Sequence, residues 1–153
     1  MVHVENPNCR SIERPDSPAH WFSTIVVASE TGEPFDDKEA VIAGHIGEHV
    51  TFDTRSVDVD ADPDTGFIAI VVEIDGFDEL PVATRSVDMA LEALRDSNVD
   101  LSDLTFRGGR LVCGEQLSND ERDGWAPTPT DNRYYADDLM GPVFSEHRGL
   151  MAA

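Results

Sequence analysis

The sequence contains a single lysine, Lys38, and only two cysteines, Cys9 and Cys113. Two cysteines this far apart match neither a disulfide framework nor the ligand spacing of a zinc site. No run of about 18 apolar residues occurs, so we expect no membrane-spanning helix. The N-terminal stretch lacks both the basic start and the apolar core of a secretory signal. We therefore expect a soluble protein located in the cytoplasm or within a virus particle.

Basic side chains are scarce, whereas acidic ones are abundant. The 153 residues include 31 Asp and Glu against 11 Lys and Arg, which gives a formal net charge of −20. Such a surface does not neutralise phosphates, so we expect no direct nucleic-acid binding. Heavy aspartate with almost no lysine fits a protein in molar salt, where self-repulsion is screened. We therefore favour halophilic adaptation, with a GC-rich bacterium or its phage as the alternative source.

The apolar pattern predicts four strands. Residues 20–29 are apolar on both faces, as expected of a central strand. Residues 56–75 alternate between apolar and acidic, turn at Asp62-Pro63-Asp64-Thr65-Gly66 and return as an apolar run, which predicts a hairpin. Residues 104–114 predict either one bulged strand or a second hairpin across Gly108-Gly109.

Two helices are predicted between these strands, over residues 38–50 and 79–98, from apolar residues at helical spacing. The resulting βαββαβ succession predicts an α+β, ferredoxin-like antiparallel sheet with both helices on one face. We place this core at 20–115, after an extended N-terminal arm at 1–19. An irregular tail follows at 116–153, because prolines interrupt its periodicity.

Two helices on one face leave the other face of the sheet apolar and uncovered. The tail, the N-terminal arm or a partner chain must cover it, because a large exposed apolar patch is a liability. The tail is rich in large apolar and aromatic side chains, which fit anchors in the groove of a neighbouring subunit. The residues we assign to this partner interface are Trp125, Tyr134, Tyr135, Leu139 and Phe144. We predict a non-enzymatic structural or adaptor subunit of a homo- or hetero-oligomeric assembly, with a virus particle as one setting.

Two alternatives stay open. Small-molecule-sensing regulatory domains of the ACT type share the predicted βαββαβ order, so a regulatory ligand-binding domain is the first. The second is an acidic inhibitor that mimics DNA. Asp58, Asp60 and Asp62 alternate along one strand and would place carboxylates about 6.6 Å apart on one face. Salt adaptation explains the same row without a binding partner.

The segment His45-x-x-Glu48-His49 matches the zinc signature of the inverzincin metalloproteases. On a helix, positions i and i+4 lie on one face, so both imidazoles could hold one zinc, with the glutamate as general base. The third ligand would have to come from an acidic residue of the later helix, and nearby glycines weaken the first one. We therefore treat a zinc enzyme as a remote alternative to ordinary helix-end histidines. No serine or cysteine lies in a nucleophile motif, so we expect no catalytic residue and no cofactor.

Overall fold

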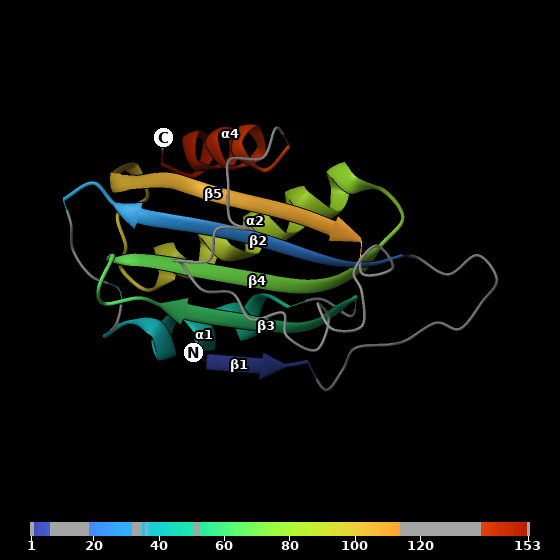
Figure 1. Cartoon of the computed structure of the whole chain (residues 1–153), viewed down its shortest axis with the longest axis horizontal. Helices are drawn as coiled ribbons and strands as arrows, with labels where there is room; N and C mark the ends of the chain where they lie inside the picture. The colour runs from blue at the N-terminus through green and yellow to red at the C-terminus, as the bar shows by residue number, and fades with distance from the viewer. Residues whose placement is uncertain are drawn as a thin grey trace.

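A computed structural model of the chain describes residues 2–6, 19–31, 35, 37–50, 53–113 and 139–152. It shows an α+β protein whose five strands form one antiparallel sheet in the order β1-β3-β4-β2-β5 (Figure 1). Three α-helices of the described part pack on this sheet. The elements are β1 (Val2–Glu5), β2 (Ala19–Ser29), α1 (Glu39–His49), β3 (Thr54–Ala61), β4 (Phe67–Gly76), α2 (Glu79–Asp96), the 3₁₀ turn η1 (Leu101–Asp103), β5 (Leu104–Cys113) and α4 (Met140–Ala152).

The core lies between the helices and one face of the sheet. The central pair β2–β4 is in register with Trp21 opposite Ile74, and Ile25 opposite Ile70. Because side chains alternate along a strand, every second residue of both strands then faces the helices. Helix α2 lies over this face, with α1 on one side of it and α4 on the other, next to β5 (Figure 1). The largest side chains that the layer buries are Ile42, Ile46, Ile68, Ile70, Ile74, Leu91, Leu94, Leu104, Met140 and Phe144.

The turn of the 56–75 hairpin and the strand at residues 104–113 are both formed in the structure. The turn between β3 and β4 lies where it was predicted: Gly66 has a φ of 75°, and its amide donates to the Asp62 carbonyl at 2.8 Å. Of the two alternatives for residues 104–114, one bulged strand is correct. Val27 pairs with Phe106 while Val26 pairs with Gly108, which leaves Arg107 as the extra residue of a β-bulge.

Two elements differ from the expectation for the chain ends. Within the predicted arm, β1 adds a fifth strand at the edge of the sheet beside β3. Within the tail predicted to be irregular, Met140–Ala152 forms helix α4. Pro142 is one of the prolines that were expected to interrupt the periodicity of the tail, but it lies in the first turn of α4, where its missing amide hydrogen is not needed. Proline therefore marks the start of this helix.

The tail residues assigned to a partner interface divide into two groups. Phe144 is 1% exposed in the core, and Leu139 packs against that core. These two side chains therefore serve the chain's own packing, contrary to the expectation for them. Trp125, Tyr134 and Tyr135 lie outside the described residues.

The sheet face opposite the helices has a buried apolar centre formed by Val26, Ala69 and Val71. The arm and the tail were expected to cover this face, but their described residues instead form β1 at the sheet edge and α4 beside α2 and β5. No helix of the described residues is long and apolar enough to cross a membrane.

A substitution at Gly76 would test how tightly the end of β4 packs against the start of α2. A Cβ atom at this position would lie 2.2 Å from Val82 Cγ2. We expect Gly76→Ala to lower the free energy of unfolding by about 1–3 kcal/mol, as overpacking does in other cores. The control is Gly44→Ala on α1, where a Cβ meets nothing within 4 Å. It should raise stability by up to about 1 kcal/mol through helix propensity. Equal effects in denaturant unfolding would contradict the described packing.

Candidate functional site

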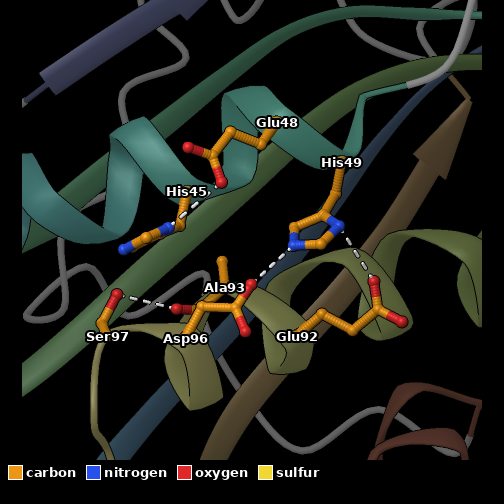
Figure 2. A network of polar contacts seen from close by, with 7 residues as sticks. All are labelled: His45, Glu48, His49, Glu92, Ala93, Asp96 and Ser97. Carbon is orange, nitrogen blue, oxygen red and sulfur yellow. Dashed lines mark hydrogen bonds and ion pairs between the residues drawn. The ribbon is translucent and has the colours of Figure 1, made fainter.

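Helices α1 and α2 face each other through a set of histidines and carboxylates (Figure 2). His49, the last residue of α1, lies between two acidic side chains of α2. Its Nδ1 is 3.2 Å from Glu92 Oε2, and its Nε2 is 2.8 Å from Asp96 Oδ2. His45, one turn earlier, has its Nδ1 3.3 Å from Glu48 Oε2 of the same helix.

The end of α2 has a defined geometry that holds the Asp96 turn in place. Asn98 adopts a φ of 64°, and the Val99 amide donates to the Leu94 carbonyl at 3.0 Å, as in a Schellman motif. Ser97 Oγ donates to the Ala93 carbonyl at 2.7 Å. The hydrogen bond from His49 holds the pKa of Asp96 below its ordinary value. The contact therefore joins the end of one helix to the last turn of another.

The zinc interpretation requires that three ligands converge on one point with an open fourth position. The His45 ring is turned away from the His49 ring, toward its own Glu48 (Figure 2). Nδ1 of His49 faces Glu92, whereas Nε2 faces Asp96. A metal ion bound to one of these nitrogens would therefore have only one of the two carboxylates beside it. Across the described ranges, no group of three or more His, Cys, Asp or Glu is arranged to hold a metal. The geometry of these residues fits a polar contact between helices.

A second histidine network lies on the sheet face opposite the helices. His20 Nε2 on β2 is 2.6 Å from Glu73 Oε1 on β4, in an ionic contact that lacks hydrogen-bond geometry. Ser56 Oγ on β3 donates to Glu73 Oε2 at 2.7 Å. The contact with His20, followed by the bond from Ser56, lowers the pKa of Glu73 despite its burial.

This trio contains a serine, a carboxylate and an imidazole, but in an order unsuited to nucleophilic catalysis. In a catalytic triad the imidazole takes the serine proton, and the carboxylate orients the imidazole. Here the carboxylate lies between the two, and its lowered pKa makes it a weak base. Ser56 is therefore a hydrogen-bond donor that stabilises the charge of a half-buried carboxylate.

At the sheet edge, His3 of β1 contacts two carboxylates. Its Nδ1 lies 2.5 Å from Asp58 Oδ1 on β3, and its Nε2 lies 3.4 Å from Glu5 Oε1. The hydrogen bond to Asp58 is the main reason that the pKa of His3 is raised above its ordinary value of 6.5. This contact joins the first strand to the rest of the sheet.

Several carboxylates of the sheet and the helices have partners inside the molecule. Asp58 and Glu73 contact histidines, and Arg55 Nε donates to Asp75 Oδ1 at 2.9 Å. Arg85 pairs with Asp53 beside them. On the helix side, His147 of α4 contacts Asp88 of α2. All five histidines of the chain therefore face carboxylates, and one of these carboxylates, Asp58, belongs to the row of Asp58, Asp60 and Asp62.

One small surface hollow of about 100 Å³ lies where β2 ends and α1 begins. Asp103 lies at its rim and accepts hydrogen bonds from the hydroxyls of Ser29 and Thr31. Ligand pockets generally have volumes of about 300–1,000 Å³, so this hollow suits at most a very small polar molecule. The residues that line it are Ser29, Phe35, Lys38, Asn98, Val99, Asp100 and Asp103.

Local sequence spacing identified part of this arrangement. The spacing predicted that His45 and Glu48 lie close together on one helix. It did not predict that His49 contacts carboxylates of α2. The contacts of His3 and His20 could not be predicted from local spacing, because their partners are 55 and 53 positions away in the sequence. Alternation of His3 with Val2 and Val4 was the one available signal of a strand.

Comparison of the chain with known protein families, curated proteins and solved structures found no match.

His49 should contribute to stability through its contacts between helices. We expect His49→Ala to lower the free energy of unfolding by about 0.5–1 kcal/mol, because partly exposed contacts between a histidine and carboxylates are worth about this much. His45→Ala is the matched control on the same helix, and should cost at most about 0.3 kcal/mol. An equal or larger loss for His45→Ala in urea unfolding would contradict the assignment.

The His3–Asp58 contact predicts a pH dependence with a defined sign. A raised histidine pKa stabilises the fold fully below 6.5, and this contribution is lost as the pH rises through the raised value. Wild type should exceed His3→Ala in unfolding free energy by up to about 1 kcal/mol at low pH, because the half-exposed pair is screened by solvent. The difference should vanish well above neutral pH. A difference that grows with pH would rule out this origin.

Proposed function

We propose that the protein is a non-enzymatic structural or adaptor subunit of a larger protein assembly, in the cytoplasm or in a virus particle. The observation that carries the proposal is an apolar corner at the junction of β4 and α2. Phe77 is 70% exposed and Leu80 is 58% exposed. Adjacent exposed large apolar side chains are typical of surfaces that contact another protein.

The side chain of Phe77 contributes little to the packing of the chain's own core. It lies directly before Asp78, the N-cap of α2, where an apolar residue often packs against the residue five positions later. That residue, Val82, is 3% exposed and packs inside, whereas Phe77 remains in solvent. The aromatic ring is therefore free to contact a neighbour.

The turn that carries Phe77 is held by several contacts. Trp21 Nε1 donates to the Gly76 carbonyl at 2.8 Å, and the Asp75 amide donates to the Asp53 carbonyl at 2.9 Å. Gly76 itself fits tightly against Val82. A preorganised aromatic anchor loses little entropy on binding, which is a property of interface hot spots.

The non-enzymatic part of the proposal is supported by the histidine contacts. These contacts join neighbouring helices and strands, which is a structural role. Phe144 and Leu139 stabilise α4, so in the proposal the outward contacts of the tail are left to Trp125, Tyr134 and Tyr135. Salt adaptation of the acidic surface is part of the same proposal.

We further propose that β2-α1-β3-β4-α2-β5 is a ferredoxin-like unit, to which β1 and α4 are added. The sheet order β3-β4-β2-β5 supports this. The connection from β2 through α1 to β3 passes over β4, and the one from β4 through α2 to β5 passes over β2. Each βαβ unit is thus split by one strand, as in that arrangement. A regulatory ligand-binding role of the ACT type remains the second candidate, favoured only by the small hollow beside Lys38.

Replacing the exposed corner tests the assembly proposal. We expect the double substitution Phe77→Ser and Leu80→Ser to reduce the share of chain in complexes about 30-fold, because two anchors together contribute 2 kcal/mol or more. The measurement is native mass in extracts of producing cells.

The matched control is Val41→Ser with Leu150→Ser. These residues are 51% and 70% exposed and lie on other helices. The control variant should assemble like wild type, and both variants should unfold at the same denaturant concentration. Equal loss in both variants, or in neither, would contradict the proposal.

A further inference from the structure

Strand β1 is the smallest and most peripheral strand of the sheet. Its four residues pair only with β3 among the described strands, with Val2 opposite Val59 and Val4 opposite Val57 (Figure 1). The core cluster of buried residues includes none of its side chains; Val2 and Val4 pack against that cluster from outside. The remaining four strands and the helices therefore keep their mutual contacts when β1 leaves.

The pairing of β1 with β3 is nevertheless specific. His3 Nδ1 lies 2.5 Å from Asp58 Oδ1 on one face, while Val4 Cγ1 would lie 3.6 Å from a Cβ on Gly47 of α1 on the other. After the strand, Asn6 Nδ2 donates to the Thr54 carbonyl, and the Asn6 amide donates to the Arg55 carbonyl, both at 2.9 Å. The β3 edge thus recognises two valines and an imidazole in a fixed register.

Residues 7–18 connect β1 to β2. At about 3.3–3.6 Å per residue, this connection can reach about 40 Å. A domain of this size has a radius of gyration of about 15 Å, so the reach is close to its full width. The connection is therefore long enough for β1 to lie on the β3 edge of a neighbouring molecule.

We infer that β1 exchanges between two copies of this chain. The β1 strand of each copy then pairs with β3 of the other, and His3 of each copy contacts Asp58 of the other. A second copy is the occupant of choice because it presents the same residues in the same register that the edge already binds. Exchange of an identical element is a low-cost route to a dimer, since no new interface has to be formed. The inference rests on the proposed function only in that both describe an assembly; the surface and the partner are different.

Complementary charge variants test the exchange in the full-length chain. His3→Asp places a carboxylate opposite Asp58 within one copy, and Asp58→His places an imidazole opposite His3 within another. In a sample of one variant, positions 3 and 58 carry the same kind of side chain. They repel each other whether β1 binds its own β3 or the β3 of another copy. In a mixture of the two, both exchanged pairs again join an imidazole to a carboxylate.

We expect the mixture to contain at least ten-fold more dimer, of twice the 16.8 kDa chain mass, than either variant alone. Native mass is measured below pH 6.5 and in high salt, which screens the repulsion between chains of net charge −20. Circular dichroism checks that each variant is folded; if one is not, the pair His3→Glu and Asp58→Arg replaces it. A mixture with no more dimer than its components overturns strand exchange.

The same experiment separates this inference from the proposed function. If wild type assembles while the mixture does not dimerise, the assembly uses another surface, and strand exchange is wrong. If the mixture dimerises while Phe77→Ser with Leu80→Ser leaves wild-type complexes intact, strand exchange stands and the apolar corner is not the contact.

Discussion

The apolar layer between the central strand pair β2–β4 and helix α2 is the constraint on which the rest of the structure depends. Both strands present every second side chain to this layer, and α2 buries an apolar stripe that includes Leu91 and Leu94. Helices α1 and α4 flank α2 and complete the cover. The position of each polar contact between elements follows from this arrangement, because it sets which helix faces meet.

The second constraint is the large excess of carboxylates over basic groups. The chain has 31 Asp and Glu against 11 Lys and Arg, and its five histidines add further contacts to carboxylates. They lie where elements meet: His49 between α1 and α2, His147 between α4 and α2, and His3 between β1 and β3. Proton uptake by His3, whose pKa is raised mainly by the hydrogen bond to Asp58, therefore strengthens the contact between β1 and β3.

Much of the fold could be predicted from the sequence, because it depends on local periodicity and turn chemistry. The 56–75 hairpin and its Gly66 turn follow from alternation and from a glycine able to adopt positive φ. The strand β1 could not be predicted, since four residues are a weak periodic signal and their partner is more than fifty positions away. Helix α4 was missed because Pro142 was weighed without its position in the first turn. The exposure of Phe77 depends on how the turn packs, which no local pattern encodes.

The central claim is that this chain works within an assembly. Its most direct test is the native mass of the wild-type protein by light scattering, in low and high salt, alone and with extract of its producing cells. The account predicts a mass above the 16.8 kDa of one chain in at least the high-salt or the extract sample. A species of one chain mass under every condition would contradict it.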